Sequence, residues 1–405
     1  MTEKALSHIR VLELGRILAG PWAGQLLADL GAQVIKVERP GRGDDTRQWG
    51  PPYLQNEQGE PTNESAYYLA ANRGKQSVTI DITRPQGQQA IRDLVAQCDV
   101  LIENFKVDGL KKYGLDYDSL RAINPRLVYC SVTGFGQTGP YRHRPGYDIM
   151  IQAMGGLMSV TGERDELPGG GPQKVGIAVV DLFTGLYAAV AIQAALAERE
   201  KSGLGQHIDL ALLDVQVASL SYLAMNYIVG GQIPQRMGNT HPSIVPYQSF
   251  PTADGHIVLA VGNDGQFAAF CEVAGCPDLA KDPAYATNPQ RVKNRDKLCE
   301  ILTQALSAHD TAYWLNALEQ RGVPCGPINR IDQVFADEQV IHRQMQQTLE
   351  HPLSKTVAQV GNPIKLSRTP IELEQPAPTL GQHNHEIFAD LLGYDEQTIQ
   401  NLVES

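Results

Sequence analysis

The chain has 405 residues, more than a typical single domain, so we expect two domains and ample capacity for a buried core. The composition, 42% hydrophobic and 20% charged, excludes a disordered chain. The formal net charge of -11 argues against a general nucleic-acid binder, which normally carries a basic face, but it leaves small anionic ligands open.

The N-terminal residues and the cysteines favour a cytoplasmic protein. The stretch "MTEKALSHIRVLELG" carries Glu3 and has no long apolar core, so it does not resemble a secretory signal. The six cysteines form no CxxC pair and show no metal-ligand spacing. We therefore expect reduced thiols that mostly pack in the interior, and no metal site.

The first 65 residues predict a strand, a helix, a second strand and then a long polar segment. "IRVLEL" (9–14) and "QVIKVE" (33–38) are predicted strands, and "PWAGQLLADLGA" (21–32) is a predicted helix with Pro21 near its first position. The Pro- and Gly-rich segment 39–65 is typical of a functional or mobile loop.

The alternation of strand and helix then resumes. "KQSVTIDI", "DVLIENF" and "RLVYCSVTGFG" are predicted strands, separated by the predicted helices "RPQGQQAIRDLVAQ" and "YDSLRAI". This pattern predicts an α/β fold with a Rossmann-like parallel sheet covered on both faces, in a large domain over 1–225. Short strands and turns predict a smaller α+β domain over 226–330, and 331–405 is predicted to return to the large domain.

One apolar run, "GIAVVDLFTGLYAAVAIQAALA" (176–197), contains a single charged side chain from 178 to 197, that of Asp181. A membrane span is one interpretation, but the run is Ala-rich and continues into the charged "EREKSGLGQ". A buried core helix is the favoured interpretation.

Asp181 would then lie in the first turn of that helix, where the helix dipole favours a carboxylate. Its role can be that of a capping residue or of a catalytic one, and the spacing alone does not decide. Thr184, Gly185 and Ala188 follow on the same face and predict a shallow surface that another backbone or a ligand could approach.

Basic residues gather in or beside loops near the predicted strand ends, a pattern that suits a polyanionic ligand or a solvated surface. They are Arg39, Arg42, Arg47, Arg73, Lys75, Lys106, Lys111 and Lys112. Glu38 ends its strand as a ribose-binding acid would, yet the turn "GRILAGP" lacks GxGxxG, and no P-loop is present. His241, in "GNTHPSIVPYQSF", is either a polar contact to substrate or a loop histidine satisfied by backbone.

Together these stretches resemble the class III CoA-transferases, which include formyl-CoA and carnitine CoA-transferases. The resemblance covers essentially the whole chain and rests on "VLELGRILAGPWAGQLLADLGAQVIKVERPGRGDDTR", "NRGKQSVTIDI", "DVLIENF", "GYDIMIQAMGGLMSVTG", "VVDLFTGLYAAVAIQAAL" and "LGQHNHEI". Within the family, "GDDTRQWGPP", "GNDGQF" and "VPCGPINRIDQVF" are most similar to the succinyl-CoA:glutarate (dicarboxylate) members.

The resemblance implies an interlocked homodimer that moves CoA from an acyl-CoA donor such as succinyl-CoA to a carboxylic acid such as glutarate. Asp181 would be the nucleophile, forming first an acyl-aspartyl mixed anhydride and then an aspartyl-CoA thioester. The CoA thioester is a substrate, and no permanently bound cofactor, nucleic acid or membrane is implied.

The resemblance also assigns contacts with CoA, residue by residue. The assigned residues are Leu18, Ala19, Arg39, Ile80, Thr83, Asn104, Phe105, Lys106, Lys112, Tyr147 and Asp148. Of these, Arg39 would meet the nucleotide end, and Tyr147 and Asp148 would line the thioester site. The chain departs from formyl-CoA transferase in having Leu18 in place of a glutamine and in lacking a "GGGGQ" loop, which puts the gating of the intermediate in doubt.

Other functions stay open. An α-methylacyl-CoA racemase would use a histidine of a "GHD" motif, whereas this chain has "GYD" with Tyr147, a poor base near neutral pH. A nicotinamide-dependent dehydrogenase would require glycines that "GRILAGP" lacks. A non-catalytic CoA-binding scaffold, or a transferase for oxalate, itaconate or carnitine-type acids, is also compatible.

Overall fold

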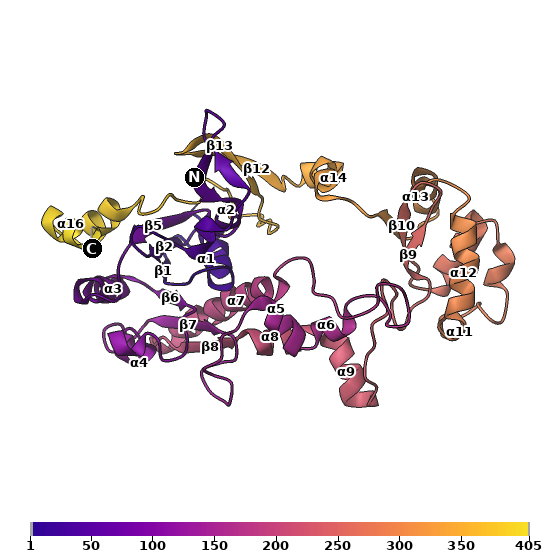
Figure 1. Ribbon diagram of the computed structural model, residues 1–405, viewed down its shortest axis with the longest axis horizontal. Helices are drawn as coiled ribbons and strands as arrows, with labels where there is room; N and C mark the ends of the chain where they lie inside the picture. The colour runs from indigo at the N-terminus through magenta and orange to yellow at the C-terminus, as the bar shows by residue number, and fades with distance from the viewer. Residues whose placement is uncertain (1–2, 404–405) are drawn as a thin grey trace. The chain divides into compact units, whose positions relative to one another are not determined.

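The structure, a computed structural model, describes residues 3–403 and groups the chain into two compact units (Figure 1). The first unit comprises Met1–Leu157, Val175–Met225 and Glu338–Ser405, and the second comprises Met158–Lys174 and Asn226–Asp337. The domain limits at 225 and 330 stay predictions.

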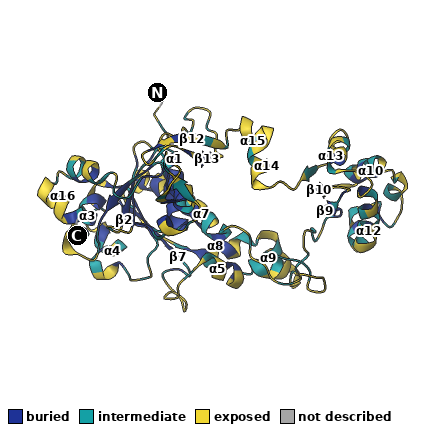
Figure 2. Cartoon of the chain, turned by 45° about the horizontal axis from the view of Figure 1, so that its top comes forward, coloured by how far each residue is buried: buried dark blue, intermediate teal, exposed yellow. Residues whose placement is uncertain are grey.

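A six-stranded parallel sheet forms the centre of the first unit, with the strand order β5-β2-β1-β6-β7-β8. Its strands are β1 (Arg10–Glu13), β2 (Gln33–Glu38), β5 (Lys75–Thr79), β6 (Val100–Glu103), β7 (Val128–Thr133) and β8 (His207–Ala211). Most of their residues are buried, as Figure 2 shows for the central strands. The predicted α/β fold with a parallel sheet is confirmed.

Helices cover both faces of this sheet because successive strand residues point to opposite sides. On one face, Val11 and Val34 share a core with α1 (Ala19–Asp29) and α7 (Val179–Ser202). On the other, Leu12 and Ile35 share a core with α3 (Pro85–Gln97), α4 (Tyr117–Arg121) and the C-terminal α16 (Glu396–Val403).

The remaining elements of the first unit are shorter. Its other helices and helical turns are η1 (Asp45–Gln48), α2 (Ala66–Asn72), η2 (Lys111–Tyr113), α5 (Asp148–Met154), α8 (Leu212–Ser219), α15 (Glu338–His342) and η4 (Glu386–Leu391). Two antiparallel hairpins pair β3 (Tyr53–Gln55) with β4 (Pro61–Ser65), and β12 (Gln346–His351) with β13 (Ser354–Val360). The segment 39–65 is therefore partly ordered as η1, β3 and β4, although its composition predicted a loop.

The second unit has its own core around a three-stranded antiparallel sheet. Its elements are β9 (Tyr247–Pro251), β10 (His256–Ala260), β11 (Cys325–Pro327), α10 (Asp264–Val273), η3 (Pro277–Ala280), α11 (Asn288–Lys293), α12 (Arg295–Leu306), α13 (Thr311–Glu319) and α14 (Ile331–Ala336). The chain passes between the units within α6 (Leu157–Val160) and α9 (Ser221–Gly230).

Helix α7 contains the apolar run that surrounds Asp181. Among residues 3–403 it is the single helix long and apolar enough to cross a membrane, and α8 and α9 meet that test only as a pair bent by 74°. The buried face of α7 includes Val180, Ala188 and Ile192, which pack in the same core as α1. This packing identifies α7 as a core helix of the first unit.

Gly185 marks the closest approach of α7 to α1. A Cβ atom at this position would lie 2.9 Å from the Ala19 carbonyl oxygen and 2.9 Å from the Trp22 Cβ atom. The small face predicted around Gly185 is therefore filled by the backbone of another helix. This face offers no room for a bound acyl group. Of the two alternatives, approach by another backbone is therefore correct and approach by a ligand is wrong.

Candidate active site

A cavity of about 950 Å³ lies in the first unit at the carboxyl ends of the parallel strands. Its walls include segments that directly follow β1, β2, β5, β6 and β7, and the first turns of α1 and α7 also reach it. Open parallel sheets bind ligands at this edge, because the strand-to-helix loops there converge. The volume is in the range of sites for small molecules and cofactors.

The cavity brings together nearly all of the residues singled out from the sequence. It is lined by Leu18, Ala19, Arg39, Ile80, Thr83, Asn104, Phe105, Lys106, Lys112, Tyr147, Asp148 and Asp181. These residues come from widely separated segments of the chain, so their meeting is a property of the fold. Their individual roles stay predictions.

His241 lies in the second unit, and its contacts there are with nearby residues. Its Nδ1 atom accepts a hydrogen bond from the Ser243 backbone N–H at 3.1 Å, and its ring lies edge-on to that of Tyr247. Burial, and then the charge of Arg295, lower its pKa. The predicted contact of His241 with substrate stays a prediction.

Asp181 is the third residue of α7, and its carboxyl group does not act as the cap of that helix. The backbone N–H groups of Val180 and Asp181 instead donate to the Asp148 Oδ1 atom at 2.9 and 3.3 Å. Burial, followed by the negative charge of Asp148, raises the pKa of Asp181 to about 7. At the start of α7, the Asp148 carboxylate therefore accepts the backbone N–H groups, and the Asp181 carboxyl group faces the cavity.

Asp148 is itself held in place by a buried amide. Gln152 is fully buried, and its Nε2 atom donates to the Asp148 Oδ2 atom at 2.6 Å. Its Oε1 atom accepts a hydrogen bond from the Val175 backbone N–H at 2.9 Å. Asp148 therefore has fixed partners for both of its oxygens, which orients it beside Asp181.

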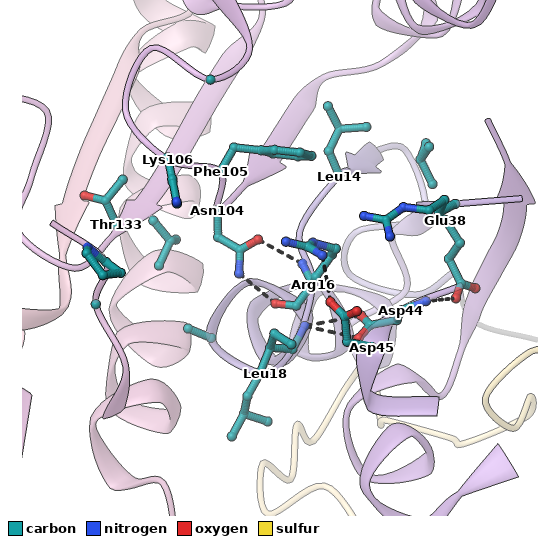
Figure 3. Close-up of a pocket in the computed structure, with 18 of the residues that line it drawn as sticks. Leu14, Arg16, Leu18, Glu38, Asp44, Asp45, Asn104, Phe105, Lys106 and Thr133 are labelled. Carbon is teal, nitrogen blue, oxygen red and sulfur yellow. Dashed lines mark hydrogen bonds and ion pairs between the residues drawn. The ribbon is translucent and has the colours of Figure 1, made fainter. Parts of the chain in front are cut away.

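Asn104 holds the turn that follows β1 (Figure 3). Its side-chain amide donates to the Arg16 carbonyl oxygen at 2.6 Å and accepts from the Arg16 backbone N–H at 2.9 Å. Because this turn leads directly to Leu18 and Ala19, Asn104 fixes the part of the cavity wall that follows the neighbouring strand β1.

Three of the basic residues expected near the cavity mouth are buried in ion pairs and do not line it. Arg73 pairs with Asp29 at 2.6 Å, and Lys75 pairs with Glu13 at 2.8 Å. Arg47 binds carboxylates on two sides, and the cavity lining includes none of the three. Their positions in or beside loops near predicted strand ends did not distinguish these internal cations from those that reach the cavity.

Glu38, whose position at the end of β2 suggested a ribose-binding acid, belongs to the cavity lining, but its carboxylate is engaged by other groups of the protein. Its Oε1 atom accepts from Ser77 at 2.6 Å, and its Oε2 atom accepts from the Asp44 backbone N–H at 2.9 Å. Arg47 donates to both oxygens, at 2.7 and 2.8 Å. With these partners, and with only 3% of its surface exposed, Glu38 secures the loop after β2.

Several cavity residues were missed by the sequence analysis. They are Arg16, Ile17, Asp44, Asp45, Trp49, Arg142 and Arg144. Arg142 and Arg144 stand in "RHRPGYD", directly before Tyr147, so a basic pair beside a predicted site residue was an available signal. Ile17 and Asp44 offered no such signal, because their role depends on backbone geometry.

Comparison with known proteins shows the family of the chain. The profile described as CoA-transferase family III matches residues 6–384. The chain belongs to CoA-transferase family III. It is an enzyme of that family, and among residues 3–403 no group of three His, Cys, Asp or Glu side chains is arranged to hold a metal ion.

Relatives of known name extend over nearly the full chain. A succinate–glutarate CoA-transferase of Agrobacterium fabrum is 52% identical over 386 residues, which cover 95% of each chain. A succinyl-CoA:glutarate CoA-transferase of Homo sapiens is 44% identical and covers 99% of this chain and 89% of its own. The crystal structure of a CAIB/BAIF family protein from Brucella suis matches with a TM-score of 0.86 and 49% identity, covering 96% of this chain and all of that one.

Proposed function

We propose that this family III CoA-transferase moves CoA from succinyl-CoA to a dicarboxylic acid, with glutarate as the preferred acceptor. The observation that carries the proposal is the cavity in which Asp181 lies among all of the assigned CoA-contacting residues. The relatives that are 52% and 44% identical, and are named for succinate or succinyl-CoA and glutarate, support this choice of substrates.

The cavity suits a CoA thioester in charge as well as in position. Arg39, Lys106 and Lys112 supply cations for the phosphate groups of CoA, although the whole chain is acidic. Asp181 lines the same cavity as Tyr147 and Asp148, and its backbone N–H donates to the Asp148 Oδ1 atom. The CoA thioester enters as a substrate, so the reaction requires no further cofactor.

The first half-reaction starts with attack of an Asp181 carboxylate oxygen on the thioester carbonyl carbon. The carbon–sulfur bond breaks, CoA leaves as its thiolate, and a mixed anhydride remains on Asp181. The thiolate then attacks the aspartyl carbonyl carbon. The bond from that carbon to the donor's oxygen breaks, the donor leaves as a carboxylate, and an aspartyl-CoA thioester remains.

The second half-reaction repeats these steps in reverse. The acceptor carboxylate attacks the aspartyl thioester and expels the CoA thiolate, which forms a second mixed anhydride. The thiolate then attacks the acceptor's carbonyl carbon, which releases the new CoA ester and restores the Asp181 carboxylate. No water enters the balance, and a dry setting protects both anhydrides from hydrolysis.

We also propose that the enzyme is an interlocked homodimer. Helices α5, α7 and α8 expose apolar side chains outside their shared core, namely Ile149, Met154, Leu186, Tyr187, Val190 and Val217. The Val190 side chain of α7, for example, is 67% exposed. Exposed apolar side chains on three helices that pack against one another are typical of a face that another chain covers.

The test of the proposed function is incubation of the enzyme with succinyl-CoA and, separately, glutarate, oxalate, itaconate, mesaconate and carnitine. We expect the highest kcat/KM with glutarate, measured by chromatography of the CoA esters. Treatment of the intermediate with borohydride or hydroxylamine should label Asp181. Labelling of a different carboxylate, or absence of exchange with every acid, would contradict the proposal.

A further inference from the structure

Two fully buried lysines share one carboxylate, and one of them, Lys36, belongs to the cavity lining. Lys36 of β2 and Lys75 of β5 both contact Glu13, at 3.0 and 2.8 Å, and none of the three side chains is exposed. A charge buried in this way is costly unless it is paired, so each lysine has to be explained by its contacts.

The two lysines differ in what else they hold. Lys75 donates to the Pro21 carbonyl oxygen and to Asn72, at 2.8 and 2.9 Å, which lie within or beside helices. Lys36 donates to the Gly15 carbonyl oxygen at 3.0 Å and contacts the Asp44 Oδ2 atom at 3.0 Å. Lys36 therefore reaches the turn between β1 and α1, whereas Lys75 does not.

Asp44 links Lys36 to the backbone of Ile17. Its two carboxylate oxygens each lie 3.3 Å from the Ile17 backbone nitrogen, which donates to them. Thr46 fixes the Oδ1 atom through its backbone N–H and its hydroxyl, at 3.0 and 2.8 Å. Burial opposes ionisation of Asp44, but the charge of Lys36 and the bonds from Thr46 outweigh it and lower the pKa.

Ile17 requires this support because its backbone is left-handed, with a φ of +72°. A β-branched residue rarely adopts that conformation, and it persists only where its surroundings enforce it. The residues that follow, Leu18 and Ala19, form the cavity wall at the start of α1. The strained turn therefore decides how this wall faces the ligand.

We propose that Lys36 is a positioning residue that, through Asp44 and the Gly15 carbonyl, holds Ile17 left-handed so that Leu18 and Ala19 fit the acyl-CoA. The proposal rests on the proposed function in one respect, the use of this cavity for CoA. Lys36 belongs to the cavity lining, but its side chain has no exposed surface and its ammonium group is engaged by Glu13, Asp44 and the Gly15 carbonyl oxygen, so we infer that it acts through the turn.

The test compares Lys36→Met with Lys75→Met, a matched control that removes a second buried cation from the same Glu13. The measurements are the dissociation constant of coenzyme A, by calorimetry, and KM and kcat for succinyl-CoA. We expect Lys36→Met to raise both the dissociation constant of coenzyme A and the KM for succinyl-CoA by about tenfold. Lys75→Met should change each of these constants by less than about twofold. Equal effects of the two variants would overturn the proposal.

Rescue separates positioning from general damage. Glycine adopts a φ of +72° without strain, so Ile17→Gly added to Lys36→Met should restore most of the lost coenzyme A affinity. Where Lys36→Met does not fold, Asp44→Asn tests the same link, with the same expected loss and the same rescue. Loss that Ile17→Gly does not relieve, or folded variants with unchanged affinity, would overturn the proposal.

The binding measurement also separates this inference from the proposed function. If the wild-type enzyme binds coenzyme A but exchanges it with none of the acids, the proposed function fails. The comparison of coenzyme A affinities among these variants then still decides the role of Lys36.

Discussion

Asp181 combines a partly buried position with a neighbouring carboxylate, and both raise its pKa to about 7. Below pH 7 the carboxyl group is mostly protonated, and above it the carboxylate, which is the proposed nucleophile, prevails. We therefore expect kcat/KM for succinyl-CoA to fall about tenfold per pH unit below about 7 and to be level above it. A rate measured from pH 5 to 9 that does not change across this window would contradict the assignment.

Asp148 supplies the smaller part of this shift, so its removal should move the profile. Asp148→Asn retains an oxygen that accepts the Val180 N–H but has no charge. The pKa of Asp181 should fall, and the midpoint of the pH profile should move to lower pH. A midpoint that stays in place or rises would show that Asp148 does not act on Asp181 electrostatically.

Replacement of Asp181 separates catalysis from folding. A raised acid pKa means that ionisation costs folding free energy, and this cost appears as the pH rises from the unfolded pKa through the folded one. Asp181→Asn should therefore abolish CoA exchange while its melting temperature at pH 8 is no lower than that of the wild type. A variant that loses both activity and thermal stability would point to a structural role.

At the scale of elements, the contact between α1 and α7 depends on Gly185. Gly185→Val would place side-chain atoms against the Ala19 carbonyl and Trp22, where a Cβ already lies at 2.9 Å. We expect a loss of about 1–3 kcal/mol in the free energy of unfolding, measured with denaturant. Gly176→Ala is the control, because its Cβ would meet nothing within 4 Å, and its effect should be below about 0.5 kcal/mol.

The sequence predicted the elements better than it predicted their contacts. Regular alternation of short apolar strands with helices is a local pattern, so the parallel sheet and the position of Asp181 at a helix start could be read from it. The partners of Arg73 and Lys75 could not, because a sequence records the charge of a side chain and not its burial. The left-handed backbone at Ile17 was equally hidden, since glycine is the usual sequence signal for it.

The resemblance to a family predicted more residues of the candidate site than the physical patterns did. Spacing alone left Asp181 open between capping and catalysis, whereas the structure gives the accepting role to Asp148. His241 was singled out by its motif, and its local contacts with Ser243 and Tyr247 do not test a role in substrate binding.

At the scale of the whole molecule, the proposed homodimer makes a direct prediction. Light scattering should give twice the chain mass of 44.2 kDa. Val190→Asp, which places a charge on the exposed apolar face of α7, should shift the enzyme toward the monomer. Ile123→Asp changes an exposed residue that follows α4, and it should leave the mass unchanged; a monomeric wild type would contradict the proposal.

The pairing of Asp148 with Asp181 also bears on the energies of the proposed intermediates. In the resting enzyme the two carboxylates repel each other, with Asp148 fixed by Gln152 and the amides of α7. Acylation of Asp181 removes one of these charges, so the repulsion vanishes in both the anhydride and the aspartyl-CoA thioester. We therefore expect the resting enzyme to lie closer in free energy to the proposed covalent forms, a balance that suits a reversible exchange.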